Sequence, residues 1–175
     1  MKILLYGSIA AGKTSLAKKI ITQHENFQYL SIDNFRRKYG DGTWKNERIA
    51  QRRFIDAFSK NTLQIIEASG VGNLGYSIFN KLISFKEKVL IIVLLIDLQE
   101  TEKRVKERRW DIPYPESTKM ISHTADSINK KIIAGNIFSL WGNYTNATII
   151  HLCQNNTDMS FLIKTINNYI KQIVK

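Results

Sequence analysis

The sequence is poor in cysteine, histidine and acidic residues, and each shortage excludes or favours a kind of site or partner. Its single cysteine, Cys153, permits no internal disulfide. The longest apolar run, residues 89–96, is far shorter than the roughly 20 residues that cross a bilayer, so no membrane partner is expected. No basic-then-apolar leader precedes the first apolar segment, which predicts a cytoplasmic protein. No structural metal site is expected, because the histidines lack the spacing of metal ligands: His24, His123 and His151.

The shortage of acidic residues leaves a strong positive charge. The chain has 26 Lys and Arg against 15 Asp and Glu, a formal net charge of +11. This charge favours anionic partners such as nucleotides, nucleic-acid ends or phosphorylated metabolites, without choosing between them. At 175 residues the chain is long enough for about one domain.

Short apolar segments alternate with segments of helical periodicity along the whole chain. The pattern predicts an α/β protein with a mostly parallel sheet covered by helices on both faces. The predicted strands are residues 2–6, 29–32, 63–67, 89–96 and 148–152. The predicted helices are residues 12–23, 46–59, 76–85, 99–109, 117–140 and 159–173. Both prolines, Pro113 and Pro115, fall between the fourth and fifth of these helices, which predicts a loop there.

The most specific motif follows the first predicted strand and begins at Gly7. It matches the P-loop pattern Gly-x-x-x-x-Gly-Lys-Ser/Thr between a strand and a helix. Its backbone N–H groups and the helix N-terminus would bind polyphosphate, with Lys13 on the β- and γ-phosphates and the Thr14 hydroxyl on Mg²⁺. The predicted nucleotide-binding residues are Gly7, Ser8, Ile9, Ala10, Ala11, Gly12, Lys13, Thr14 and Ser15.

A second candidate site follows the second predicted strand, because ligands gather at the carboxyl ends of parallel strands. Asp33 stands there three positions before Arg36. The carboxylate of Asp33 would accept the proton of an attacking hydroxyl or orient it, and Arg36 would hold an acceptor phosphate. The alternative is that Asp33 only caps a helix and Arg36 is a solvated surface charge.

After the third predicted strand, Glu67 precedes a glycine-rich loop. Glu67 would hold a water on Mg²⁺ or bind the acceptor, and Gly70 and Gly72 would let a substrate approach the backbone. Alternatively, Glu67 makes only a structural hydrogen bond. Gly70, Gly72 and Gly75 also spell a dinucleotide-binding fingerprint followed by Asp97, so an NAD-type binder stays open.

The fourth predicted helix carries two arginines one turn apart, Arg104 and Arg108, before a lid predicted around residues 109–117. Arginines delivered by a lid would stabilise the charge of a transferring phosphoryl group. The alternative is a solvated face in which these arginines pair with glutamates of the same helix.

Together these motifs resemble the P-loop kinases of the adenylate kinase-like superfamily over about the first two-thirds of the chain. The Asp-x-x-Arg motif of Asp33 and Arg36 is similar to that of polynucleotide 5′-kinases and zeta-toxin-like kinases, in which the Asp is the general base or orienter and the Arg binds the acceptor. The resemblance implies strand order 2-3-1-4-5, ATP with Mg²⁺ as donor, and adenine near residues 153–157. One departure is Glu67, where many P-loop proteins have Asp.

The sequence therefore predicts a single P-loop kinase domain over residues 1–175. Its predicted activity is transfer of the γ-phosphoryl group of ATP to a nucleoside, nucleotide, polynucleotide 5′-end or small metabolite. Two other classes stay open, a nucleotide-gated ATP-binding module without kinase activity and a nucleic-acid-binding module suggested by charge. Several aromatic residues near the predicted pocket either stack on an acceptor base or belong to the core: Phe35, Tyr39, Trp44 and Tyr76.

Overall fold

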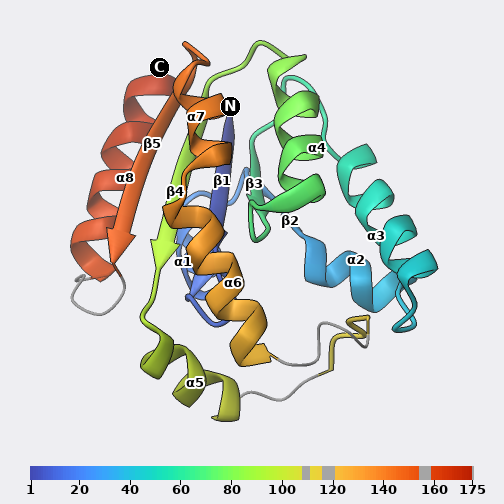
Figure 1. Cartoon of the computed structure of the whole chain (residues 1–175). Helices are drawn as coiled ribbons and strands as arrows, with labels where there is room; N and C mark the ends of the chain where they lie inside the picture. The colour runs from blue at the N-terminus through green and yellow to red at the C-terminus, as the bar shows by residue number, and fades with distance from the viewer. Residues whose placement is uncertain (108–110, 116–120, 154–158, 175) are drawn as a thin grey trace.

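The computed structural model describes residues 1–107, 111–115, 121–153 and 159–174 (Figure 1). Its strands are β1 (Lys2–Gly7), β2 (Gln28–Ser31), β3 (Gln64–Glu67), β4 (Val89–Leu95) and β5 (Ala147–Cys153). Its helices, over the same ranges, are α1 (Lys13–Gln23), α2 (Ile32–Tyr39), α3 (Trp44–Asp56), α4 (Gly72–Ile83), α5 (Leu98–Glu107), α6 (Ile121–Ile133), α7 (Asn136–Gly142) and α8 (Met159–Val174).

The five strands form one parallel sheet in the order β2-β3-β1-β4-β5. This confirms the expected α/β fold and strand order. The register pairs Leu5 of β1 with Glu67 of β3, which in turn pairs with Ser31 at the end of β2. On the other side of β1, Gly7 pairs with Leu94 of β4. The register therefore brings the carboxyl ends of these strands to one edge of the sheet, where ligands of such folds bind.

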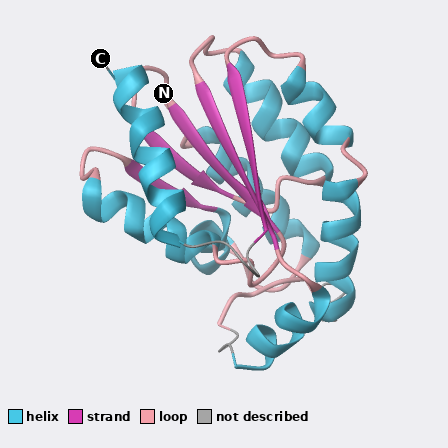
Figure 2. Cartoon of the chain, turned by 90° about the vertical axis from the view of Figure 1, so that its left-hand side faces the viewer, coloured by secondary structure: helices cyan, strands magenta, loops and turns pink. Residues whose placement is uncertain are grey.

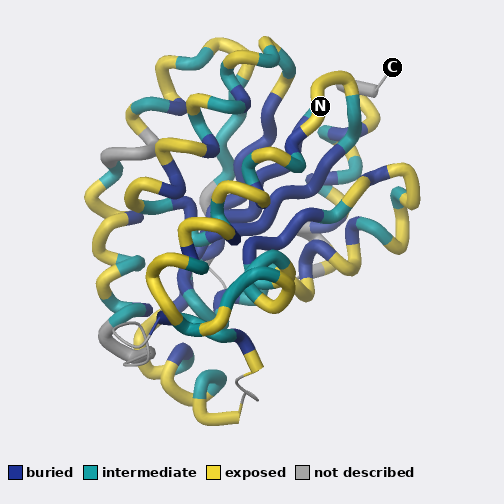
Figure 3. The backbone as a smooth tube through the Cα atoms, turned by 90° about the vertical axis from the view of Figure 1, so that its right-hand side faces the viewer, coloured by how far each residue is buried: buried dark blue, intermediate teal, exposed yellow. Residues whose placement is uncertain are grey.

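Helices cover both faces of the sheet, because successive side chains of a buried strand point to opposite sides. In β1, Ile3 and Leu5 belong to a core shared with α1 and α8. Leu4 and Tyr6 belong to the opposite core, which includes side chains from α3, α4, α6 and α7. Figure 2 shows the strands between the two helical layers, and Figure 3 shows the strands buried beneath helices with exposed outer turns.

Several helix boundaries differ from the sequence prediction, for example the early start of α4 at Gly72, and two of the differences have a clear local cause. The helix predicted over residues 117–140 is two helices, α6 and α7, within the described part of that range. Gly135 separates them with a φ of +78°, a left-handed conformation that glycine adopts without steric cost. Helix α3 begins at Trp44, two residues earlier than expected, because the Thr43 hydroxyl accepts the backbone N–H of Asn46 at 3.2 Å.

None of the described helices combines enough length with enough apolar character to cross a bilayer.

Candidate active site

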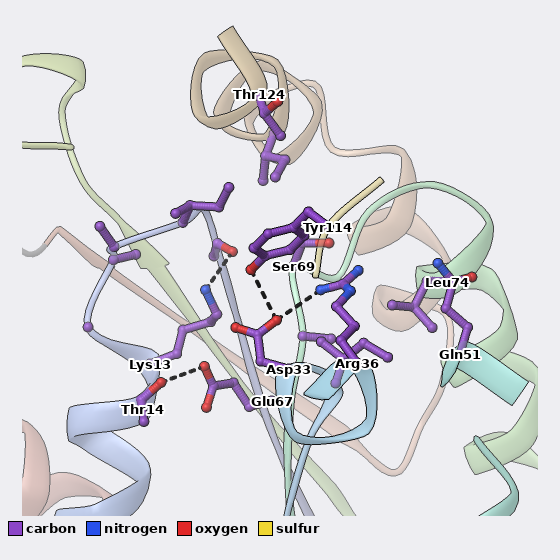
Figure 4. A pocket seen from close by; sticks show the side chains of 18 of the residues that line it. Lys13, Thr14, Asp33, Arg36, Gln51, Glu67, Ser69, Leu74, Tyr114 and Thr124 are labelled. Atoms are coloured by element: carbon purple, nitrogen blue, oxygen red, sulfur yellow. Dashed lines mark hydrogen bonds and ion pairs between the residues drawn. The ribbon is translucent and has the colours of Figure 1, made fainter. Parts of the chain in front are cut away.

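A cavity of about 600 Å³ opens at the carboxyl edge of the sheet. Its walls come from the P-loop and the start of α1, the end of β3 and the loop after it, α2, α3, α4, α5, residues 114–115 and α6. Figure 4 shows that side chains from these separate segments point into one space. Residues predicted for phosphate binding, metal binding and acceptor binding thus line the same cavity.

The P-loop forms the inner wall of this cavity. Gly7 has no room for a side chain, because a Cβ atom there would lie 2.5 Å from the backbone oxygen of Leu94. Gly12 stands immediately before α1 with a φ of +87°, so the helix starts with its first turn at the cavity. Because a helix N-terminus carries partial positive charge and unpaired N–H groups, this wall is suited to phosphate.

Lys13 rests on the loop that precedes it. Its Nζ donates hydrogen bonds to the backbone oxygens of Gly7, at 3.1 Å, and Ser8, at 2.6 Å. The ammonium group is therefore already at the P-loop. A phosphate oxygen would be the stronger acceptor for this ammonium group, because it carries negative charge and the backbone oxygens of Gly7 and Ser8 do not.

The two residues predicted to support Mg²⁺ are in direct contact. The Thr14 hydroxyl donates to a carboxylate oxygen of Glu67 at 2.9 Å (Figure 4). The Tyr29 hydroxyl donates to the other oxygen of that carboxylate. Burial and then the charge of Glu67 raise the pKa of Tyr29 above its ordinary value, so the phenol stays a donor. Hydroxyl and carboxylate oxygens are the hard ligands that Mg²⁺ prefers, and the donor set fits the ion.

Asp33 lies in the first turn of α2, and not before the helix as the sequence suggested. Its Oδ1 forms an ion pair with Arg36 at 2.9 Å and accepts the hydroxyl of Tyr114 at 3.1 Å. In Figure 4 it lies between Lys13 and Arg36. Asp33 thus stands where the phosphate end of the cavity meets the end predicted to bind the acceptor.

Arg36 is held by a second carboxylate that the sequence did not single out. Its Nε and Nη2 donate to the two oxygens of Glu47, at 2.9 and 2.7 Å, while the Tyr114 ring covers the guanidinium at 4.9 Å. Burial lowers the pKa of Arg36, but the hydrogen bonds and charge of Glu47, followed by Asp33, outweigh it and raise the pKa. Arg36 therefore stays charged at any accessible pH.

Of the two predicted lid arginines, Arg104 lies in the described part of the chain and Arg108 does not. Arg104 pairs with Glu100 at 2.7 Å, as the surface alternative expected, and also donates to the backbone oxygen of Ala10 at 3.3 Å. Its guanidinium thus reaches the P-loop and lines the cavity. Arg108 lies outside the described residues, as do most of the residues implied to surround adenine.

The described part of the predicted lid, residues 111–115, lies against α2. Arg37 pairs with Asp111 at 3.0 Å, and the Tyr114 hydroxyl reaches Asp33. The rest of the predicted lid, residues 109–110 and 116–117, lies outside the described residues. The contacts of this segment place Tyr114 over the cavity.

The glycine-rich loop contributes Ser69 and Leu74 to the cavity wall. Neither Gly70 nor Gly72 is among the described lining residues, so their role in substrate binding stays a prediction. The structure gives Gly70 a packing role, because a Cβ atom there would lie 2.3 Å from the Tyr6 ring. Glycine at position 70 is thus required by the core of the protein.

No protein-family model and no curated protein matches the chain, but solved structures do. Shikimate kinase from Bacteroides thetaiotaomicron is 12% identical with a TM-score of 0.62, over 98% of both chains. Deoxyadenosine kinase from M. mycoides with bound dATP is 16% identical with a TM-score of 0.56, over 98% of this chain and 100% of that chain. The chain has the fold of the P-loop kinases.

A third structure with this fold is Kti12 from Chaetomium thermophilum in complex with ADP-AlF3. It is 12% identical with a TM-score of 0.64, over 96% of this chain and 98% of that chain. Identities this low show a shared fold alone. Within the P-loop kinase fold, the function of this chain has to be argued from its own cavity.

Sequence reasoning missed Glu47, Gln51 and Tyr114, which all line the cavity. Glu47 and Gln51 are four residues apart on α3, a spacing that places two side chains on one helix face, and Gln51 donates to Glu47 at 2.6 Å. Both lie on the face of α3 that also carries the buried Ala50 and Phe54, so a polar pair at helical spacing within this buried face is the signal that would have found them.

Proposed function

We propose that the protein is a cytoplasmic ATP-dependent phosphotransferase, formed by residues 1–175 as one kinase domain. The acceptor is a nucleoside, nucleotide, polynucleotide 5′-end or small metabolite. One observation carries the proposal: Asp33 shares a single cavity with the P-loop, between Lys13 and Arg36. A base next to a phosphate-binding loop is what transfer to an acceptor requires.

The donor would bind at the P-loop end. The phosphates of ATP would accept hydrogen bonds from the loop and from the first turn of α1. Lys13 would exchange its loop carbonyl partners for the β- and γ-phosphates, which carry full charge. Thr14 and, through a water, Glu67 would hold Mg²⁺, which neutralises phosphate charge when bound.

The transfer itself would use residues from α2 and α5. An acceptor oxygen attacks the γ-phosphorus in line, the bond from that phosphorus to the β–γ bridging oxygen breaks, and ADP leaves. Asp33 accepts the hydroxyl proton or orients the hydroxyl, and Arg36 positions the acceptor. Arg104 would stabilise charge from its place beside the P-loop, and we propose the same role for Arg108.

The experiment is transfer of labelled γ-phosphate from ATP with Mg²⁺ to a panel of acceptors. The panel holds nucleosides, nucleoside monophosphates, 5′-hydroxyl oligonucleotides, sugars and small metabolites. We expect label in one acceptor class, and its loss in Lys13→Ala and in Asp33→Asn. The matched controls, Lys60→Ala and Asp56→Asn, change exposed residues away from the cavity and should keep full activity.

Two results would contradict the proposal. If label reaches only water, or if ATP binds without turnover, a nucleotide-gated binding module is the better account. If the protein binds a nicotinamide dinucleotide, and Lys13→Ala does not weaken that binding, the glycines after β3 form the nucleotide site. Each result is read directly from product analysis or from equilibrium binding.

A further inference from the structure

The acceptor end of the cavity is built around a neutralised arginine. Two carboxylates hold Arg36: Asp33 at 2.9 Å from Nη1, and Glu47 through both Nε and Nη2. Glu47 is itself buried, with 3% of its surface exposed, and receives a further hydrogen bond from Gln51. The three charged groups together carry one negative charge in excess.

This arrangement disfavours a phosphate at Arg36. An arginine binds phosphate best through two parallel N–H bonds from one edge of the guanidinium, and Glu47 occupies the Nε and Nη2 edge. The Tyr114 ring covers one face of the same group. A phosphate would have to displace Glu47 or lie beside two carboxylates, and like charges placed side by side oppose binding. Arg36 therefore positions the acceptor indirectly, through the two carboxylates that it holds in place.

The same arrangement favours hydroxyl groups. A carboxylate has about four lone-pair sites. Oε1 of Glu47 already accepts from Arg36 and Gln51, so the hydroxyls of a ligand would donate to the other carboxylate oxygens. The walls around the carboxylates are apolar and aromatic, from Leu74 and Trp44, and Trp44 is 55% exposed although it lines the cavity. Carboxylates beside such walls suit a ring that carries hydroxyls, because the ring packs on the walls while its hydroxyls donate.

We propose that the acceptor is an uncharged ring compound bearing hydroxyls, such as a nucleoside or a sugar, and that Glu47 excludes phosphorylated acceptors. This inference rests on the proposed function, since it names the acceptor of that same site. Arg48 is exposed and lines an adjoining hollow that shares Trp44 and Glu47 with the cavity, so a phosphate attracted to the surface would meet it outside the buried cluster. Glu47 is then a residue that determines specificity, missed by the sequence and supplied by the fold.

The test measures binding of matched pairs by calorimetry, with the P-loop first saturated by a non-hydrolysable ATP analogue and Mg²⁺. Each pair is an alcohol and its own phosphate: thymidine and its monophosphate, adenosine and AMP, ribose and ribose 5-phosphate, glucose and glucose 6-phosphate. We expect the uncharged member of at least one pair to bind roughly tenfold or more tightly than its phosphate. A tighter phosphate in every pair that binds, or no binding by any uncharged member at millimolar concentration, would overturn the proposal.

Glu47→Gln tests the residue itself, because it keeps the shape of the side chain and removes its charge. The ratio of affinities should move toward the phosphorylated member by roughly tenfold, since the guanidinium regains charge for a phosphate. The control Asp56→Asn removes one negative charge from the same helix and should leave the ratio unchanged. An unchanged ratio in folded Glu47→Gln would overturn the assignment of Glu47, and if that variant does not fold, the wild-type pairs still decide the class of acceptor.

A further variant, Trp44→Ala, changes an exposed side chain and should weaken both members of a pair to a similar extent, because either ring packs on that wall. The preference against phosphate should therefore stay unchanged. Binding and transfer separate the two proposals. Transfer of label to a phosphorylated acceptor would support the kinase and refute this inference. A clear preference for the uncharged member without transfer to any acceptor would support the inference on the pocket and refute the kinase.

Discussion

Replacing Gly70 by alanine is the sharpest test of the packing beneath the active site. Gly70 has a φ of +78°, and an added Cβ atom would lie 2.3, 2.5 and 2.7 Å from three ring atoms of Tyr6. These distances are far inside van der Waals contact, and the ring cannot withdraw because Tyr6 is fully buried in the core. Gly72 offers the matched control: its φ is +65°, yet a Cβ atom there meets no atom within 4 Å.

The expected loss in the free energy of unfolding has two parts, which Gly70 and Gly72 separate. The left-handed backbone alone costs an alanine about 1–2 kcal/mol, and this term applies to both Gly70→Ala and Gly72→Ala. Overpacking against the ring adds about 1–3 kcal/mol at Gly70 only. We therefore expect Gly70→Ala to lower the free energy of unfolding by about 2–5 kcal/mol in total, a large part of the stability of an ordinary domain.

The assay is equilibrium unfolding in urea, followed by circular dichroism. A double-mutant cycle with Tyr6→Leu should recover part of the Gly70→Ala cost, because the smaller side chain relieves the clash. Affinity for an ATP analogue is a second readout, since the backbone oxygen of Ser69, next to Gly70, accepts the N–H of Gly7 at 3.3 Å. Equal stabilities for Gly70→Ala and Gly72→Ala would refute the packing argument. Loss of ligand binding alone would instead assign Gly70 to a ligand.

Two further predictions concern carboxylates at opposite ends of the sheet. Burial raises the pKa of Glu87, but hydrogen bonds from the Asn61 backbone N–H and from Lys2, among others, outweigh it and lower the pKa below 4.5. Its stabilisation is thus present above about pH 4.5 and lost as the pH falls through the lowered pKa of Glu87. Glu87→Gln should therefore cost roughly 1–3 kcal/mol at pH 7 and progressively less as the pH falls below about 4.5, measured by urea unfolding across pH. Tyr114→Phe removes the hydroxyl that donates to Asp33 and keeps the ring. The rate of phosphoryl transfer should therefore fall roughly tenfold while the melting temperature stays unchanged. A lower melting temperature with an unchanged rate of transfer would count against this role.

The P-loop and the sheet could be predicted because their signals are local and strong. The motif from Gly7 to Thr14 is continuous in sequence, and the strand before it and the helix after it have clear periodicity. The contact between Thr14 and Glu67 joins residues 53 positions apart, yet it follows from one rule, that the carboxyl ends of parallel strands share an edge. Local motifs combined with that rule thus located the phosphate end of the site.

The end of the cavity at α2 could be predicted only in part, because the other partners of Asp33 and Arg36 are set by the packing of α3 and residues 111–115 on α2. Asp33, three positions before Arg36, was found from the sequence. Glu47 follows Arg36 by eleven positions, and no helix or strand periodicity relates residues at that spacing across two helices. Tyr114 comes from a proline-rich segment, 81 residues from Asp33. Only the tertiary fold brings these side chains together.

The net charge favours an anionic ligand at the P-loop end of the cavity, but it does not describe the charge at the other end. The excess of +11 lies largely on exposed side chains, among them a group on α2 and α3: Arg37, Lys38, Lys45, Arg48, Arg52 and Arg53. These charges raise the potential around an anionic donor such as ATP, but solvent screens them beyond about 8–10 Å at ordinary salt. Inside the cavity the near charges decide, and there two carboxylates surround Arg36. A basic protein can therefore have an acceptor pocket that selects an uncharged molecule.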